Sequence, residues 1–233
     1  MPAVYVNSAA ILKAFCGEHG GLTCTSSNAR KVIEWSWARR EKILFFPDEH
    51  LGRNTANKMG IPREQMIVWD PYMPRGGNSV EAIQRAKLIL WKGHCSVHQM
   101  FQPSHVDYFR KQYPDVKVIV HPECHEDVVN KADLVGSTEY IIRTITAAQA
   151  GTTWAVGTEL NLVNRLKHEQ TDKKVFFLSS TVCQCATMYR IDAPHLCWAL
   201  ENLADGHVVN RIVVPDDEKQ WAKVALDRMM ALS

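Results

Sequence analysis

The segment His121-Pro-Glu-Cys124 carries three side chains that can do chemistry within four residues. An imidazole and a carboxyl group can each act as a base, an acid or a metal ligand. Pro122 fixes its own φ angle and disfavours helix at His121, so we expect a stiff turn that displays these side chains. A purely structural role, with His121 bonded to a carbonyl and Glu123 solvated, is the alternative on these residues alone.

The seven cysteines are the second group of candidates. An odd number without a secretory signal favours metal ligation or buried thiols over a disulfide framework. Cys95 lies in Gly93-His-Cys-Ser-Val-His98, between a predicted strand and a predicted helix, where backbone amides can lower the pKa of a thiol. Packing as a small apolar residue is the alternative there. Cys183 and Cys185 are one residue apart, a spacing that matches neither a zinc CxxC pair nor a ferredoxin run.

Hydroxyl groups precede two predicted helices, in Thr25-Ser-Ser-Asn-Ala29 and in Gly136-Ser-Thr138. A hydroxyl beside a helix N-terminus suits a phosphate or a carboxylate ligand. Ordinary N-capping explains each segment separately. The two together favour an anionic ligand.

Short apolar runs alternate with segments of helical period, which is typical of strands and helices wound into parallel α/β sheets. We expect strands at Val4–Val6, Ile43–Phe46, Ile67–Trp69, Leu88–Trp91, Val116–Val120, Trp154–Val156, Val175–Leu178 and Arg211–Val214. We expect helices over Ser8–Phe15, Ala29–Glu41, Ser104–Tyr113, Glu139–Gly151, Pro194–Leu203 and Glu218–Leu232.

The richest turn segment lies over residues 71–78 and predicts a boundary between two α/β domains, 1–86 and 87–233. Polar and metal-capable residues follow most of the predicted strands. In open α/β sheets ligands bind outside the carboxyl ends of the strands, so we expect one shared site between the two domains.

Composition narrows the classes of function. With 46% hydrophobic and 22% charged residues, the chain is typical of a folded globular protein. The net charge of +2 without a basic block argues against a nucleic-acid or membrane surface, so we expect small-molecule partners. There is no long apolar run and no signal peptide, which predicts a cytoplasmic protein.

Eight motifs occur in one order along the chain. They are Tyr5-Val-Asn7-Ser, Thr25-Ser-Ser-Asn-Ala29, Pro47-Asp-Glu-His-Leu-Gly-Arg-Asn54, Gly93-His-Cys-Ser-Val-His98, His121-Pro-Glu-Cys124, Val135-Gly-Ser-Thr138, Gly157-Thr-Glu159 and Cys185-Ala-Thr-Met188. Each is weak alone, but in this register they strongly resemble the quinolinate synthase family, the iron–sulfur enzymes of de novo NAD biosynthesis. The resemblance covers nearly the whole chain.

The resemblance implies a fold of αβα domains with parallel sheets, three in the family, related by a pseudo-threefold axis. One cysteine from each domain holds a [4Fe–4S] cluster, and Cys95 and Cys185 look like two of these ligands. Cys124 is similar to a family position that does not bind the cluster. We favour Cys185 over Cys183 because Cys-Ala-Thr-Met188 matches the family's ligand and the residues directly after it.

The implied reaction condenses iminoaspartate with dihydroxyacetone phosphate to quinolinate, with loss of phosphate and water and with the cluster as Lewis acid. By resemblance, Glu123 is the general base and His121 binds substrate beside it. Tyr5, a further catalytic candidate, and Asn7 touch the substrate. The remaining implied substrate-binding residues, which hold phosphate or carboxylate groups, are Ser26, Ser137 and Thr138. The family also implies a functional link to L-aspartate oxidase.

The family's first domain, with its cluster cysteine, has no counterpart here, so we expect two of the three domains. Cys16 and Cys24 fall in the wrong domain to replace that ligand. We therefore expect the chain alone to bind little iron, to make no quinolinate and to self-associate. Two alternatives stay open: a non-catalytic fragment that keeps substrate-binding elements, and a zinc-dependent hydro-lyase that uses Cys95 with the His121–Glu123 turn.

Overall fold

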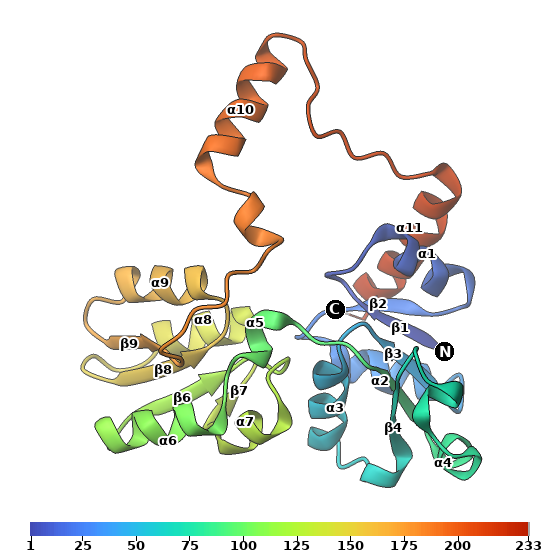
Figure 1. The fold of residues 1–233 in the computed structure, drawn as a ribbon, viewed down its shortest axis with the longest axis horizontal. Helices are drawn as coiled ribbons and strands as arrows, with labels where there is room; N and C mark the ends of the chain where they lie inside the picture. Colours follow the sequence, from blue (N-terminus) through green and yellow to red (C-terminus); the bar gives the residue numbers. More distant parts are fainter. Residues whose placement is uncertain (233) are drawn as a thin grey trace.

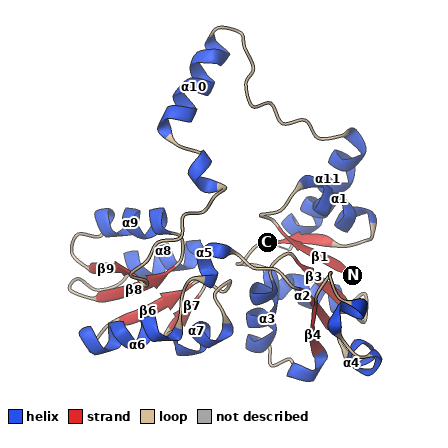
Figure 2. Ribbon diagram, viewed as in Figure 1, coloured by secondary structure: helices blue, strands red, loops and turns tan. Residues whose placement is uncertain are grey.

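The computed structural model describes residues 1–232 and contains two separate parallel sheets (Figures 1 and 2). The first sheet has the order β2-β1-β3-β5-β4 and the second the order β7-β6-β8-β9. Every strand pair is parallel. The expected fold class, two α/β units with parallel sheets, is confirmed.

The strands are short and apolar, as strands covered on both faces must be. Those of the first sheet are β1 (Pro2–Tyr5), β2 (Leu22–Cys24), β3 (Ile43–Phe46), β4 (Met66–Trp69) and β5 (Leu88–Trp91). Those of the second sheet are β6 (Lys117–Val120), β7 (Leu134–Val135), β8 (Thr153–Gly157) and β9 (Lys174–Phe177).

Helices alternate with the strands along the chain. The first unit contains α1 (Ala10–Glu18), α2 (Ala29–Trp37), α3 (Glu49–Lys58), α4 (Val80–Arg85) and the last helix, α11 (Asp216–Met230), with short 3₁₀ turns at Arg63–Gln65 and Pro74–Gly77. The second unit contains α5 (Ser96–Gln99), α6 (Pro103–Gln112), α7 (Glu126–Lys131), α8 (Thr138–Thr146) and α9 (Leu160–Glu169). A 3₁₀ turn at Met188–Arg190 and helix α10 (Ala193–Ala204) follow β9.

The two faces of the second sheet carry separate cores. Alternate residues of a strand point to opposite faces. Accordingly Val118 and Val120 of β6 pack with α6 and α7, while Ile119 between them packs with α8 and α9. Figure 1 shows the two helix pairs on opposite sides of the sheet.

The structure differs from the expected partition in two places. Strand β5 pairs with β3 and β4, so the chain leaves the first sheet only after Trp91 and not at residue 86. The turn-rich segment 71–78 is therefore a connection inside the first unit. In addition, α11 returns from the far end of the chain to pack on α1 and β2 (Figure 1).

The strand predicted at Arg211–Val214 is wrong. This apolar run lies in the connection between α10 and α11, and Ile212 is 89% exposed. Strand β2 was not predicted, because three residues are too few for an alternation pattern to show.

Helix α10 and its flanking connections extend away from both sheets (Figure 1). None of its residues is buried. Exposed large apolar side chains run through this region, namely Val182, Met188, Tyr189, Ile191, Leu196, Trp198, Leu200, Leu203, Val208, Ile212 and Val213. A contiguous apolar surface of this kind marks a contact surface.

Within residues 1–232, the helices are all too short or too polar to span a lipid bilayer.

The contact between α1 and α11 generates a stability prediction. A Cβ atom on Gly17 would lie 1.9 Å from the carbonyl oxygen of Trp221, so the two helices cross at this glycine. Although alanine favours an isolated helix, we expect Gly17→Ala to lower the free energy of unfolding by about 1–3 kcal/mol, because the backbones must separate. Urea denaturation measures the change.

The neighbouring exposed residue supplies the control, since Glu18→Ala should alter the free energy of unfolding by less than about 0.5 kcal/mol. If Gly17→Ala is as stable as the parent chain, α11 is not docked on α1 in solution.

Candidate functional site

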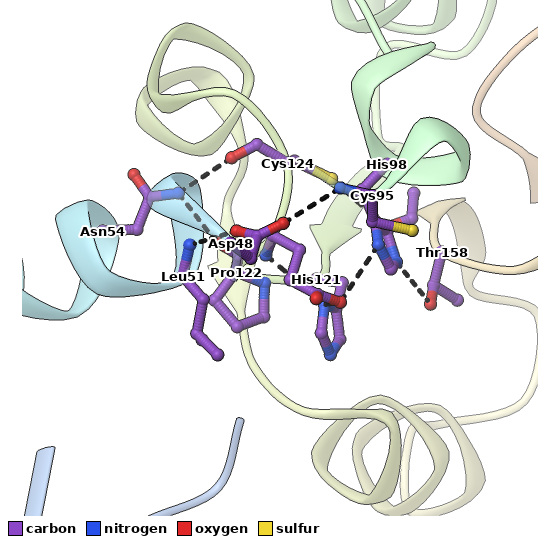
Figure 3. Close-up of polar contacts among 11 residues, drawn as sticks. Asp48, Leu51, Asn54, Cys95, His98, His121, Pro122, Cys124 and Thr158 are labelled. Atoms are coloured by element: carbon purple, nitrogen blue, oxygen red, sulfur yellow. Dashed lines mark hydrogen bonds and ion pairs between the residues drawn. The ribbon is translucent and has the colours of Figure 1, made fainter. Parts of the chain in front are cut away.

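Four strand ends from the two sheets supply one cluster of polar side chains (Figure 3). Asp48 follows β3, His98 follows β5, His121 and Glu123 follow β6, and Thr158 follows β8. All five side chains are buried. The carboxyl ends of parallel strands are the expected place for a ligand site.

One carboxylate oxygen of Glu123 contacts two imidazole rings. Its Oε2 atom is 3.2 Å from Nδ1 of His98 and 3.2 Å from Nδ1 of His121. The two rings stack with centroids 4.5 Å apart and an interplanar angle of 17°. On the other side of its ring, Nε2 of His98 is 3.5 Å from the Thr158 hydroxyl. The turn is closed by the Glu123 N–H, which donates to Nδ1 of His121.

The electrostatics of this trio favour a charged pair with a neutral neighbour. Burial raises the pKa of Glu123, but both imidazoles outweigh it and bring that pKa down to about 2. Burial lowers the pKa of His98, but the Cys95 thiol and Glu123 outweigh it and raise the pKa to about 9. Burial, together with the nearby charge on His98, lowers the pKa of His121. At neutral pH the site therefore holds a carboxylate, an imidazolium and a neutral imidazole.

Donor atoms of His98, His121 and Glu123 all lie within 4.8 Å of one another, which raises the question of a metal ion. An imidazole nitrogen coordinates a metal in the plane of its own ring. Two rings stacked at 17° do not share a plane, so one ion cannot satisfy both without rotation of a ring. The stacking therefore argues against an ion bound by both rings, whereas the zinc hydro-lyase alternative uses Cys95 with the His121–Glu123 turn and is not tested by it.

Asp48 connects the loop after β3 with the loop after β5. Its Oδ1 atom accepts a hydrogen bond from the Leu51 N–H (2.8 Å) and caps α3, while its Oδ2 atom accepts one from the Cys95 N–H (3.0 Å). Burial and the charge of Glu123 raise the pKa of Asp48 to about 7, against the opposing effect of these two hydrogen bonds.

Asn54 links the first unit to the turn that carries Glu123. Its side-chain amide donates to the carbonyl oxygens of Pro122 and Cys124, both at 2.8 Å. A bidentate ion pair between Arg63 and Glu126 joins the units nearby. The two sheets are thus held together beside the cluster.

Tyr5 lies at the end of β1 and is 8% exposed. Burial and the charge of Glu123 raise its pKa, while a hydrogen bond with Ser26 opposes the rise. Asn7 is exposed and Ser26 is half-buried. Asn28, buried, organises that loop by accepting from the Thr25 N–H.

Ser137 and Thr138 begin α8. The Ser137 hydroxyl accepts from the Tyr140 N–H at 3.3 Å, so it acts as the N-cap of the helix. Thr138 is exposed.

The cysteines fall into two groups. Cys16, Cys24 and Cys124 are fully buried, and burial raises the pKa of each thiol, which disfavours the thiolate that a metal needs. Cys95 and Cys185 are half-exposed free thiols, as is Cys183.

The accessible thiols suit thiolate ligation, so the donor set fits two ligands of an iron–sulfur cluster. Cys185 makes a local contact, since the Met188 N–H lies 3.4 Å from its sulfur. Among residues 1–232, no hydrogen bond or ion pair joins Cys185 to Cys95 or to Glu123.

Sequence reasoning singled out the turn at Glu123 but gave no role to His98, Asp48, Asn54 or Thr158. The available signal for Asp48 and Thr158 was their position closely after a strand, whereas His98 lies in the short helix α5. Asn54 had no such signal, because it lies inside a helix.

Comparison with known proteins identifies relatives for nearly the whole chain. The family model described as "Quinolinate synthetase A protein" matches residues 2–231. The chain is also similar to three proteins named quinolinate synthase. They come from Rhodopirellula baltica (59% identical over 233 residues), Acidobacterium capsulatum (57% over 234) and Herpetosiphon aurantiacus (54% over 234). Each match covers 100% of this chain but only 59%, 63% and 62% of the relative, respectively. The chain thus spans about three fifths of the length of these relatives.

The charged pair generates a titration prediction. In Glu123→Gln we expect the pKa of His98 to fall below its value of about 9, because the carboxylate that favours the imidazolium is gone. In the parent chain, protonated His98 stabilises the fold below its ordinary pKa of 6.5, and this contribution is lost as the pH rises through about 9. Histidine NMR signals followed against pH measure the shift.

Glu139→Gln makes the same change on the exposed surface of α8 and is the control, since it should leave the pKa of His98 at about 9. An unchanged pKa of His98 in Glu123→Gln would mean that the pair does not form.

Proposed function

The chain belongs to the Quinolinate synthetase A protein family, and from this premise we propose that it forms the greater part of a quinolinate synthase. The proposed reaction condenses iminoaspartate with dihydroxyacetone phosphate and releases phosphate and water. The observation that carries the proposal is the buried Glu123 carboxylate in contact with two imidazoles, beside the accessible Cys95 at neighbouring strand ends. This arrangement combines a proton acceptor with a soft metal ligand.

Glu123 and His121 act together as the proton acceptor in this proposal. The carboxylate stays ionised throughout the neutral range, and the low pKa of His121 keeps that ring uncharged and able to take a proton. Because the two groups are 3.2 Å apart, they titrate as a pair, and a proton taken by one is shared with the other. His98 contacts the same oxygen of the carboxylate, Oε2, at 3.2 Å.

Cys95 and Cys185 would hold a [4Fe–4S] cluster. Such a cluster supplies Lewis acidity toward a carbonyl or hydroxyl oxygen. Cys124 is left out of this ligand set, and its full burial, with the thiol 3.7 Å from the carbonyl oxygen of Gly157, supports that choice.

The remaining candidates would contact the substrates. Tyr5 and Ser26 are already linked beside the cluster of polar groups. Asn7 and Thr138 are exposed and free to meet a ligand, while Ser137 stands at the N-terminus of α8, where an anion is favoured. We propose Tyr5, also a catalytic candidate, and Asn7 as contacts to the substrate, and Ser26, Ser137 and Thr138 as contacts for its phosphate and carboxylate groups.

The alternative is a fragment that folds but does not catalyse. Two observations favour it for the chain in isolation: the relatives are longer, and the exposed apolar surface around α10 has no cover within residues 1–232. A cytoplasmic location, small-molecule partners without nucleic acid or membrane, and a functional link to L-aspartate oxidase, which would supply iminoaspartate, belong to the synthase proposal.

Tests of catalysis use what we call the complemented enzyme. It consists of this chain together with the part of the Rhodopirellula baltica relative that the chain does not cover, reconstituted anaerobically with iron and sulfide.

The ligand assignment predicts that Cys95→Ser and Cys185→Ser each remove the visible thiolate-to-iron absorbance of the complemented enzyme, since serine is a poor soft ligand. Iron and sulfide counting gives a second measure. Cys124→Ser and the exposed Cys197→Ser should both keep the cluster. A full cluster in Cys185→Ser, together with its loss in Cys183→Ser, would move the ligand by two residues.

The base assignment predicts a loss of turnover without a loss of cluster. Glu123→Gln keeps the shape of the side chain and removes its basicity, so kcat should fall by roughly 10²–10⁴-fold while the cluster absorbance stays. Glu139→Gln on the exposed surface of α8 is the matched control and should leave kcat unchanged. Normal turnover in Glu123→Gln would return this residue to a structural role.

A further inference from the structure

Helix α3 touches the loops on both sides of the site, although no function described above uses it. It begins after Asp48, which holds the Cys95 loop, and it carries Asn54, which holds the Glu123 turn. We propose that α3 is the element that sets the position of Glu123 relative to Cys95, and that Asp48 and Asn54 are its two positioning residues. The inference rests on the proposed function, which gives that spacing its catalytic meaning.

The contact of α3 with the Cys95 loop is made by a single buried carboxylate, that of Asp48. Asp48 is 3% exposed, and its two oxygens are divided between the helix and the loop. Oδ1 accepts from the Leu51 N–H of α3, and Oδ2 accepts from the Cys95 N–H. A shift of the Cys95 loop therefore breaks a bond to the helix cap.

The contact of α3 with the Glu123 turn is made by a single buried side-chain amide, that of Asn54. Asn54 is 2% exposed, and its Nδ2 atom donates to the carbonyl oxygens of Pro122 and Cys124, the residues on either side of Glu123. These oxygens belong to the second unit, whereas Asn54 belongs to the first. The amide thus fixes the backbone around Glu123 from outside its own sheet.

The helix between Asp48 and Asn54 packs closely on the first sheet. A Cβ atom on Gly52 would lie 2.5 Å from Leu90 Cδ2 and 2.8 Å from Phe45 Cδ1, so α3 lies directly against β3 and β5. Leu51 beside it is fully buried. From residue 48 to residue 54 a helix rises about 9 Å. This length separates the contact of Asp48 with the Cys95 loop from the contact of Asn54 with the Glu123 turn. Small errors in the position of catalytic groups lower the rate of catalysis.

Backbone amide hydrogen exchange in the 233-residue chain tests the contacts of Asp48 and of Asn54 separately. Asn54→Leu removes both hydrogen bonds at nearly constant shape, so the amides of Glu123 and Cys124 should exchange at least about tenfold faster, the effect expected of one lost hydrogen bond, while the Cys95 amide is unchanged. Asp48→Asn leaves an acceptor for the helix cap and presents an N–H to Cys95, so the Cys95 amide alone should exchange faster.

Asn57→Leu is the matched control, because it makes the same change on the exposed side of the same helix and should alter neither loop. Asn54→Ser is a milder second variant in case the leucine prevents folding. Faster exchange spread evenly over both sheets, or no change in the Glu123 turn for either Asn54 variant, would overturn the proposal.

Kinetics of the complemented enzyme test whether Asn54 acts through Glu123. Asn54→Leu should lower kcat about a hundredfold, the cost of a small misplacement, but should have almost no further effect in a Glu123→Gln background. A merely stabilising role would lower kcat by the same factor in both backgrounds, which would overturn the inference. Normal turnover in Glu123→Gln alone would instead contradict the proposed base, whatever the exchange results show.

Discussion

The buried negative charge of Glu123 is the constraint on which the rest of the site depends. A lone carboxylate in a protein interior costs several kcal/mol, and it persists only where opposite charge and hydrogen bonds surround it. His98 supplies the charge and His121 a close neutral partner, each at 3.2 Å. To bring both rings to one oxygen, the chain must place α5, which carries His98, against the turn after β6, which carries His121 and Glu123.

The second requirement is a stable interface between the two units. If the units parted, the Glu123 turn would lose the two hydrogen bonds that Asn54 donates to the carbonyl oxygens of Pro122 and Cys124. Asn54, the Arg63–Glu126 pair and Lys58, which donates to the carbonyl oxygen of Val135, all cross this interface. None of them touches Glu123 itself. The geometry of the site therefore depends on the association of the two units. The side chains that provide this association come mainly from the first unit.

The fold was largely predictable from the sequence. Strands of a sheet that is covered on both faces are short and mainly apolar, and Ile43–Phe46 and Lys117–Val120 show this pattern. The run at Arg211–Val214 has the same composition but no neighbouring strand, a matter of tertiary context that no local pattern contains. The Glu123 turn was predictable from Pro122 and its neighbours. His98 and Asn54 were not, because their partners lie 25 and about 70 residues away and only the packed structure brings them together.

The central claim is that the base and the iron–sulfur cluster share one site at the carboxyl ends of the two sheets. A crystal structure of the complemented enzyme, with diffraction data collected at the iron absorption edge, tests this claim most directly. The account predicts a strong anomalous peak bonded to the sulfurs of Cys95 and Cys185, in the same cavity as the Glu123 carboxylate. A peak at Cys124 or Cys183, or iron separated from Glu123 by packed protein, would contradict it.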